Sequence, residues 1–495
     1  MRKGIKILGK VVSTILLLLI FLPVATTLVL NIEPVQNAVV RQASSYTSNL
    51  LGTDVYVEGI DFDLFSKVRI RGLYIEDYNK DTLLYIPHAS TSIEGLNLAK
   101  DGLRLSGTKM YGTKLYLREL PSGELNIHPL LAQLQNPDKE SDFRLYIDDI
   151  DAEELTLCYE KLEHDNRRRG SVDPNNIRLN DINTHLTNFA VVRGAVWTDI
   201  EHLSATEHSG FAINELTSHL YINNGEIALD GLNILTDNSS IYLPKLELKG
   251  DDWQSYKRFT NQVNMELRVE HSNIATDDIA YIIPTLSDWD MVVRSLSATA
   301  EGSLDDLEGS IKSAKIANDT DLEATYHIKD LPYWRDAHYV VGIEKLSSTS
   351  ADILTLANRI APEALPEDVV GIIERIEWIE LRSTVGGKLN DLRFVGNIST
   401  GAGDASGDLI LTTQENGRLA IVGEAKSESL DIGEILSLDK LHSITSEIKV
   451  NGSVGNTESG GIIGDIGVKI ASIGYAGHTF RGIEGECKVA GNDYY

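Results

Sequence analysis

Cysteine is scarce in this chain of 495 residues, which holds only Cys158 and Cys487. Two cysteines exclude a small secreted domain built on several disulfide bonds, and they leave one Cys158–Cys487 bridge as an open possibility. No cluster of cysteine and histidine has the spacing of a structural zinc site. Aromatic residues are also few, at 7%, although a hydrophobic share of 42% is enough to bury a core.

Sequence motifs for common enzyme chemistry are missing too. The chain has no Gly-x-Ser-x-Gly nucleophile elbow, no phosphate-binding loop and no dinucleotide fingerprint. The glycine-rich run 401–407 lacks a following helix and lysine, so we interpret it as a turn. His202 and His208 lie beside Glu201 and Glu207, but their separation fits neither a helix face nor the usual zinc spacings. We therefore expect no enzyme activity, no metal and no cofactor.

Positive charge is the third scarcity. The chain has 73 acidic residues against 45 basic ones, for a formal net charge of −28. A surface of this kind repels nucleic acid and anionic headgroups, so we expect no nucleic-acid partner. If the protein binds lipid, apolar surface rather than a basic patch has to hold it.

The first ten residues depart from this composition, because Arg2, Lys3, Lys6 and Lys10 stand there without an acid. The stretch Val11–Leu30 that follows carries no charge, and a helix needs about 20 apolar residues to cross a bilayer. The sequence predicts a basic cytoplasmic stub at 1–10 and a transmembrane helix at 11–30. The anchoring side chains are Val11, Ile15, Leu16, Leu17, Leu18, Leu19, Ile20, Phe21, Leu22, Leu28 and Leu30.

A cleaved signal peptide is the alternative to an anchor. Its apolar region spans about 7–15 residues and ends in small residues such as Ala-x-Ala. The apolar run here is longer, and Pro-Val-Ala at 23–25 is a poor cleavage site. Because the four cations hold the N-terminus in the cytoplasm, we expect a single-pass protein whose bulk lies in the periplasm.

After the anchor, the sequence predicts an amphipathic helix at 35–51 that ends at Gly52. From Val55 onward apolar and polar residues alternate, as in antiparallel sheets with one solvated side. We therefore expect a mainly β fold: an elongated, curled antiparallel-type sheet that forms a groove, with a few short helices. The candidate groove-lining residues are Leu103, Leu105, Leu115, Leu117, Phe143, Leu145, Ile147, Val263, Met265 and Leu267.

A pattern of apolar, any, apolar, any, glycine recurs, for example at 68–72, 103–107 and 227–231. Glycine permits the positive φ that ends or bulges a strand. The spacing between copies is irregular, which excludes a fixed-period solenoid. Helical periodicity predicts short helices at 128–134, 276–283, 350–360 and 429–436.

These elements divide the exported part into four segments. A helix and β unit is expected at 31–135, a groove segment at 136–275, a groove segment with helical insertions at 276–370, and a last groove segment at 371–495. The final residues still alternate and carry no closing signal. We expect the chain to be the front part of a longer protein.

The arrangement resembles the translocation and assembly module family called TamB and its AsmA-like relatives, in the form found in Bacteroidetes-type bacteria. The likeness covers most of the chain and consists of patterned hydrophobic segments. It begins with the anchor, the short helix and LGTDVYV at 51–57. The other segments are DLFSKVRIRGLYIED at 63–77, DTLL at 81–84, LYLR at 115–118, GELNI at 123–127, GLNILT at 231–236, SSIYL at 239–243 and DDIAYIIP at 277–284.

The resemblance implies a β-groove in the periplasm of a Gram-negative bacterium, anchored in the inner membrane and reaching toward the outer membrane. It also implies phospholipid transport and outer-membrane assembly, with phospholipid acyl chains as ligands and an outer-membrane β-barrel partner of the Omp85 type. The characteristic C-terminal region of the family is not recognisable in this chain.

Three functions remain open from the sequence. The first is a membrane-anchored conduit for phospholipid. The second is a scaffold for protein secretion or assembly, whose sheet edges pair with client strands. The third is a structural surface protein, in which the apolar faces are the cores of closed sandwiches.

Overall fold

The computed structural model describes residues 26–63, 67–97, 102–130, 144–161, 170–360, 367–414, 418–454, 462–491 and 493–494. The predicted anchor at 11–30 lies outside these ranges except for residues 26–30, which are helical. Within the described ranges, no helix has both the length and the apolar character that a membrane crossing requires. The transmembrane helix therefore stays a prediction.

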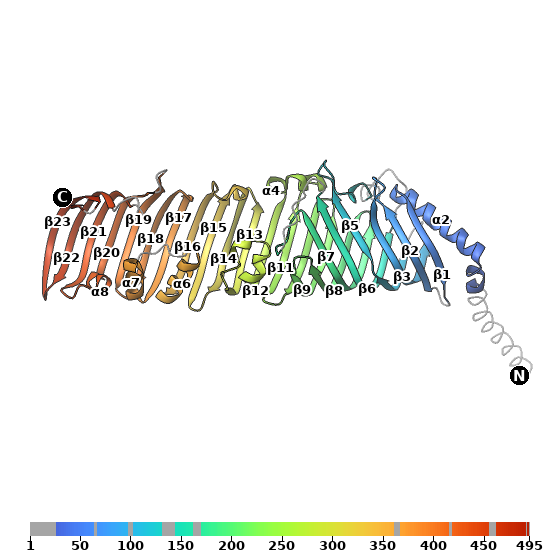
Figure 1. The fold of residues 1–495 in the computed structure, drawn as a ribbon, viewed down its shortest axis with the longest axis horizontal. Coiled ribbons are helices and arrows are strands. Elements are labelled where there is room, and N and C mark those ends of the chain that lie inside the picture. Colours follow the sequence, from blue (N-terminus) through green and yellow to red (C-terminus); the bar gives the residue numbers. More distant parts are fainter. Residues whose placement is uncertain are drawn as a thin grey trace, which may run out of the picture. The chain divides into compact units, whose positions relative to one another are not determined.

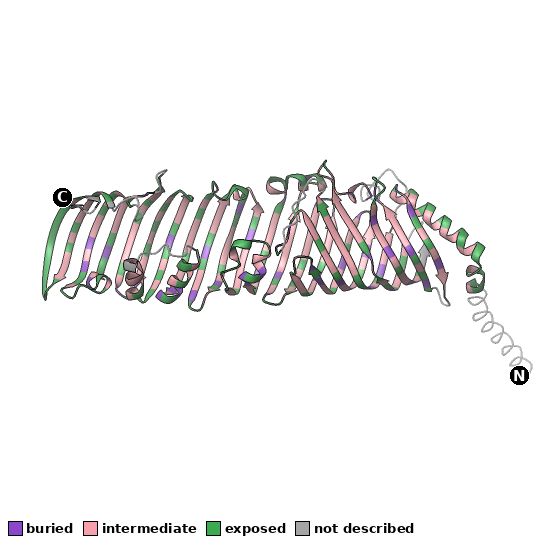
Figure 2. Ribbon diagram, viewed as in Figure 1, coloured by how far each residue is buried: buried purple, intermediate pink, exposed green. Residues whose placement is uncertain are grey.

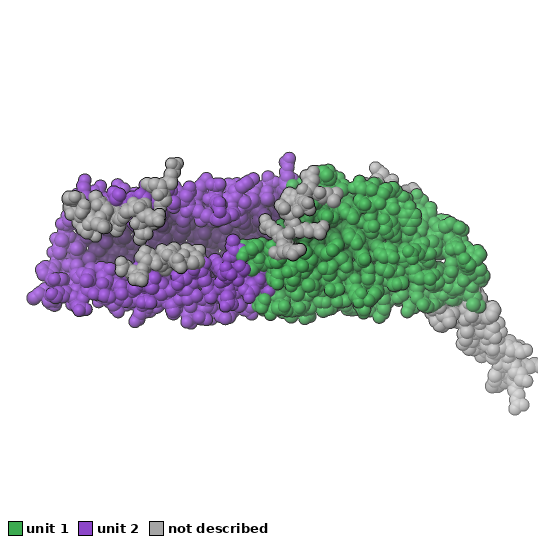
Figure 3. Space-filling model, viewed as in Figure 1, with its two compact units in different colours: residues 1–240, 247–257, 280–284 green, residues 241–246, 258–279, 285–495 purple. Residues whose placement is uncertain are grey.

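The chain forms two compact units, coloured separately in Figure 3. Unit 1 comprises residues 1–240, 247–257 and 280–284, and unit 2 comprises residues 241–246, 258–279 and 285–495. The residues of strand β11 (Ser240–Lys249) are divided between them. Both units are mainly β, as the alternation predicts. The expected segment boundaries at 135, 275 and 370 remain predictions.

The elements of unit 1 are one long helix followed by strands (Figure 1). They are α2 (Glu33–Leu51), β1 (Val55–Phe62), β2 (Lys67–Glu76), β3 (Thr82–Asn97), β4 (Gly102–Tyr111), β5 (Lys114–Glu119), β6 (Arg144–Lys161), β7 (Asn176–Val192), β8 (Ala195–Glu207), β9 (Ala212–Asn223) and β10 (Glu226–Leu235), and then the 3₁₀ helix η1 (Trp253–Arg258), whose last residue belongs to unit 2.

The elements of unit 2 are strands with helices in some of the connections (Figure 1). The strands are β12 (Asn264–Ala275), β13 (Val292–Ser303), β14 (Asp306–Ile316), β15 (Thr320–Lys329), β16 (His338–Thr349), β17 (Trp378–Lys388), β18 (Asp391–Thr400), β19 (Gly403–Thr413), β20 (Leu419–Asp431), β21 (Leu441–Val454), β22 (Ile462–Tyr475), β23 (His478–Gly491) and β24 (Asp493–Tyr494). The helices are α4 (Phe259–Gln262), α5 (Thr276–Ala280, whose last residue belongs to unit 1), η2 (Pro284–Leu286, whose first residue belongs to unit 1), η3 (Leu331–Tyr333), α6 (Ser350–Ile360), α7 (Glu367–Ile376) and α8 (Ile432–Leu436).

Helix α2 matches the predicted amphipathic helix. Pro34 stands in its first turn, where the missing N–H costs nothing. Gly52 ends it with a φ of 70°, and its N–H donates to the Ser48 carbonyl. Val35 and Val39 are half-buried, whereas Tyr46, which the same periodicity also assigns to the apolar face, is 43% exposed.

Neighbouring strands pair antiparallel through most of both units, as expected. In unit 2, for example, Leu381 pairs with Ile398 and Arg382 with Asn397, so apolar side chains meet on one face and polar ones on the other. The same rule holds in unit 1, where Ile60 pairs with Ile70 and Asp61 with Arg69. Pairing therefore turns the period-2 sequence pattern into two faces of opposite character.

Unit 1 departs from the expected antiparallel order at one step. Strands β4 and β5 both pair with β6 in parallel, with Leu105 opposite Ile147 and Leu115 opposite Leu157. A parallel pair needs a crossover connection, of which residues 120–130 after β5 are described. Alternation is identical in parallel and antiparallel strands, so the sequence pattern did not reveal this step.

Glycines of the recurring pattern bend the strands of unit 1. Gly72, Gly107 and Gly231 have φ values of 59°, 56° and 61°, and the pairing register shifts where Gly107 and Gly231 lie. Gly107 and Gly231 therefore lie at bulges, one of the two roles that the sequence pattern allows. Gly102, at the start of β4, has a φ of 77°, and a Cβ there would lie 2.1 Å from the Arg144 carbonyl oxygen.

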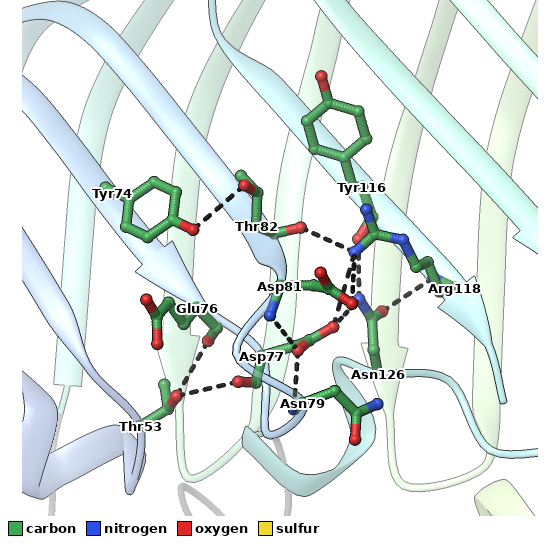
Figure 4. Close-up of polar contacts among 10 residues, drawn as sticks. All are labelled: Thr53, Tyr74, Glu76, Asp77, Asn79, Asp81, Thr82, Tyr116, Arg118 and Asn126. Carbon is green, nitrogen blue, oxygen red and sulfur yellow. Dashed lines mark hydrogen bonds and ion pairs between the residues drawn. The ribbon is translucent and has the colours of Figure 1, made fainter.

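Asp77, in the β2–β3 turn, binds Asn126 of the crossover segment, the residues that follow β5 from 120 onward (Figure 4). Its carboxylate is 1% exposed and accepts from the N–H groups of Asn79 and Asp81, at 2.8 and 3.0 Å. The Asn126 side-chain amide donates to the other carboxylate oxygen at 3.0 Å, and Arg118 lies 3.7 Å from it. Two segments of the family resemblance, 63–77 and 123–127, thus meet at one buried group.

The predicted helices are partly confirmed. Helix α6 has the predicted bounds, whereas α5 ends at Ala280 instead of residue 283 and α8 begins at Ile432 instead of residue 429. Of the helix predicted at 128–134, residues 128–130 are helical and the rest lies outside the described residues. Helix α7, which follows Pro366, is not predicted. Antiparallel connectivity places α6, α7 and α8 at one edge of unit 2, at the lower ends of the strands in Figure 1.

Replacing Gly102 by Ala should weaken the parallel step more than a glycine replacement with open surroundings does. We expect Gly102→Ala to cost about 3–5 kcal/mol locally, from backbone strain and overlap with a carbonyl. Gly231→Ala should cost about 1 kcal/mol, since its Cβ meets nothing within 4 Å. Hydrogen-exchange mass spectrometry of 102–111 and 144–161 measures the difference; equal protection in both variants would contradict the assignment.

Replacing Asp77 by Asn should release the crossover segment. The new amide would face the donating groups of Asn126 and Arg118, so we expect a loss of about 2–4 kcal/mol. The matched control is Asp81→Asn, because that side chain is 62% exposed and should change stability by less than about 0.5 kcal/mol. Faster amide exchange at 120–127 in the first variant alone is the expected result.

Candidate functional site: the apolar sheet faces

The apolar face of unit 2 is built by alternation of inward and outward side chains along its strands. In β18, Leu392, Phe394 and Ile398 are half-buried, whereas Arg393 and Val395 between them are exposed. Figure 2 shows this alternation as bands along the strands. Pairing extends it sideways, since Phe394 lies opposite Val385 of β17 and Leu409 of β19. The apolar positions therefore form one surface that runs across neighbouring strands.

The opposite face of unit 2, which we call its polar face, carries ion pairs between strands, although Val395, Ile410 and Val422 are also exposed on it. Arg393 binds the two carboxylate oxygens of Asp408 at 2.9 and 2.7 Å, and Lys449 lies 2.6 Å from Glu424. The hydrogen bond from Arg393 lowers the pKa of the Asp408 carboxyl, and the one from Lys449 lowers that of Glu424. These side chains are solvent-exposed, so they keep the face in water rather than add much stability.

A shallow depression of about 620 Å³ lies on this polar face, over strands β16 to β20. Both signs of charge line it, with Glu344, Asp408 and Glu424 beside Arg382 and Lys426. Its walls therefore select neither an anion nor a cation. We do not assign a ligand to it.

Among the described residues, the apolar face of unit 2 is curled and has no second layer over it. Large side chains such as Leu381, Phe394 and Leu409 are half-buried, a state between the full burial of a closed core and the exposure of the polar face. Figure 3 shows a hollow along unit 2, bordered by two rims of the same unit. Because the apolar face is the shielded one, we assign it to the inside of this hollow, which we call the unit 2 groove.

Small residues occupy the middle of the unit 2 groove. Ser383, Gly396, Gly407 and Ala425 are paired in series across β17 to β20. A Cβ on Gly396 would lie 2.4 Å from the Cβ of Ser383, whereas directly opposed Cβ atoms are usually about 4.5–5.5 Å apart. The sheet therefore curls tightly there, and only glycine fits beside Ser383.

The apolar face of unit 1 is better covered. Val55, Ile60, Val68, Leu83 and Ile86 are all less than a tenth exposed. Ile147, Ile150 and Ala152 form a buried cluster, against which Leu105, Met110, Leu145, Leu155, Leu186 and Phe189 pack. Unit 1 thus contains a filled core, as the closed-sandwich alternative expects, whereas unit 2 does not have a comparable cluster among its described residues.

A charged pair interrupts the apolar face of unit 1 at the end of β5. Lys161 lies 2.7 Å from Glu119, and the Tyr159 hydroxyl donates to the same carboxylate at 2.7 Å. The hydrogen bond from Lys161 lowers the pKa of the Glu119 carboxyl. Since Leu117 pairs with Tyr159 and Glu119 with Lys161 on this face, its apolar character ends at Leu117.

The structure brings most of the candidate groove-lining residues of unit 1 together. Leu103 pairs with Leu145 and Leu105 with Ile147, on the same face. Ile147 is buried, and the other described members are half-buried. The described members in unit 1 are Leu103, Leu105, Leu115, Leu117, Leu145 and Ile147; Phe143 lies outside the described residues.

The candidates near the start of unit 2 divide differently. Met265 and Leu267 lie on β12 and are half-buried on the apolar face, opposite Gly302 and Ala300. Val263 precedes the strand, after helix α4, and is 2% exposed. Its place in the alternation therefore reflects packing beside the helix rather than a groove-lining role. The alternation alone does not show where a strand begins, so it could not show that Val263 lies before β12.

Most of the unit 2 groove was not singled out from the sequence. The strands that carry Val385, Phe394 and Leu409 show the same alternation as the strands of the candidate residues. Apolar residues at every second position were therefore the signal that could have identified them. Helix α7 lies beside this region, and Arg375 on it donates to the Ile435 carbonyl at 2.6 Å. The sequence pattern gave no measure of which apolar face would stay uncovered.

Other chemistry-bearing residues do not assemble into a site. Both cysteines are free thiols, so the possible bridge is absent. His208 hydrogen-bonds to Glu207, and His202 pairs across strands with His185. In the part of the chain that the structure describes, no group of three or more histidine, cysteine or acidic side chains could hold a metal ion.

Comparisons with known proteins return nothing for this chain: no family model, no curated protein and no solved structure matches it. The unit 2 groove is therefore the feature from which a function has to be argued.

Proposed function

We propose that this protein is a periplasmic lipid carrier, anchored in the inner membrane by residues 11–30, that holds phospholipid acyl chains on their way toward the outer membrane. The observation that carries the proposal is the half-exposed apolar face of unit 2. Its large aliphatic side chains lie in a groove, and the described part of the chain places no second sheet over them. A hydrocarbon chain is the ligand that removes such a surface from water.

The energetics favour an acyl chain over a polar ligand. Each methylene that leaves water for an apolar surface contributes about 0.8 kcal/mol, so a chain in transit between membranes needs a continuous apolar contact. The groove supplies it with Leu, Ile, Val and Phe side chains. Its outer, charged face keeps the carrier in water, and the net charge of −28 leaves headgroups to the solvent rather than to a basic patch.

The test compares adjacent residues of matched hydrophobicity on opposite faces. Leu409 lies in the unit 2 groove, and Ile410 points outward with 43% exposure. We expect a photoreactive amino acid at 409 to crosslink phospholipid in cells and one at 410 to give little or no lipid adduct. Leu267 and Arg268 form a second inward and outward pair. Equal lipid labelling on both faces would contradict the proposal.

A second candidate function is a scaffold that binds client strands at a sheet edge. Strand β23 pairs with β22 on one side, whereas within the described residues only Val489 and Ala490 have a partner on the other, in β24. Phe480 and Ile483 on this edge are 47% and 43% exposed. An exposed apolar edge of this length is a template for strand addition.

Crosslinking at paired positions separates the two functions. Ile483 on β23 lies opposite Ile470 on β22. If β23 receives client strands, a photoreactive residue at 483 should give discrete protein adducts and one at 470 should give none. Lipid adducts at both positions without protein adducts would leave the carrier and reject the scaffold.

A further inference from the structure

The floor of the unit 2 groove contains a hydroxyl group without a partner. Ser383 is 8% exposed, and its Oγ atom is buried without a hydrogen bond. On neighbouring strands the buried hydroxyls of Ser427 and Ser446 pair at 2.9 Å, and those of Thr320 and Ser348 pair at 2.7 Å. Ser350 at the start of α6 shares the unpaired state of Ser383 but lies outside the strands. A buried hydroxyl without a partner is costly, so Ser383 differs from the paired hydroxyls of the strands.

The row of small residues that contains Ser383 is less crowded at Gly407 than at Gly396. Its strand neighbours in the same row are Gly396 and, beyond it, Gly407. Gly396 is tightly approached by Ser383, but a Cβ on Gly407 would meet its nearest atoms only at 3.6 Å. A methyl group would therefore overlap Ser383 at position 396, whereas at position 407 it would fit at ordinary contact distances.

The walls on either side of this floor are apolar and larger. Val385, Phe394 and Leu409 form the row on one side, and Leu381 and Ile398 lie on the other. All five are half-buried. The Oγ atom of Ser383 lies between these walls with almost no accessible surface, so an alkyl chain reaches it only where the half-buried side chains of the walls move apart.

We infer that Ser383, Gly396 and Gly407 form a subsite for an acyl chain that carries an oxygen atom partway along it, as a hydroxyl or carbonyl group. The inference rests on the proposed function, because an alkyl chain has to enter the groove for the subsite to act. The oxygen gives the Ser383 hydroxyl its missing hydrogen bond, and the walls hold the methylenes on either side. The subsite thus selects among lipids that the apolar groove alone would bind alike.

The experiment is a competition between two acids that differ by one oxygen. The full chain in amphipol is mixed with equal amounts of tetradecanoic acid and 3-hydroxytetradecanoic acid, and native mass spectrometry gives the ratio bound. We expect the hydroxylated acid to be preferred about threefold to tenfold, the range that one net hydrogen bond supplies. Ser383→Ala should reduce the ratio to about one without loss of folding, since the substitution breaks no hydrogen bond.

The matched control is Ser427→Ala, which removes a paired hydroxyl from the same face and should keep the preference. Equal binding of both acids to the unaltered chain, or a preference that persists in Ser383→Ala, would overturn the subsite and leave the carrier proposal in place. Binding of neither acid would overturn both. Gly407→Ala, which fits the space but fills part of it, should also reduce the ratio.

Discussion

In unit 2, hydrogen bonding between neighbouring strands fixes each side chain on one of two faces. The rest of this unit depends on one face being apolar and avoiding water while the other is solvated. Leu381, Ile398 and Phe394 lie on one face, while Arg382, Arg393 and Asn397 lie on the other. The sheet curls toward its apolar face, because that direction shields hydrocarbon without a second layer. What remains is a surface that is half-shielded and has no partner sheet among the described residues.

Curling brings side chains of neighbouring strands too close together, and the small residues glycine and serine avoid this overlap. Where Ser383 approaches Gly396, a second Cβ does not fit, so large side chains are confined to the two walls and small ones to the floor. Large side chains therefore line the two walls of the groove, and small side chains line its middle. Closing it with bulky residues across the floor would force the strands apart and flatten the sheet.

Unit 1 shields its apolar face from water in another way. Its strands bend at bulges such as Gly107 and Gly231, and its aliphatic side chains pack into a buried cluster around Ile147 and Ile150. The parallel step between β4 and β6 demands a long crossover, and the buried Asp77 carboxylate holds that crossover through Asn126. Unit 1, with its buried cluster and the Asp77–Asn126 contact, is suited to be rigid. The groove of unit 2 is suited to hold a flexible chain.

Sequence by itself determined the elements whose signals are local. The 3.6-residue period after Pro34 and the αL-permissive Gly52 specify α2, and the alternation specifies two-faced strands. It also supplied the uncharged run at 11–30 from which the anchor is proposed, and the resemblance that implies a lipid ligand. Only the tertiary structure decided the parallel step, the burial of Val263, the addition of α7 and which apolar face stays uncovered. The reason is physical: alternation states that one side of a strand avoids water, but how that side is shielded depends on strand order and curvature, which residues far apart in the chain set together.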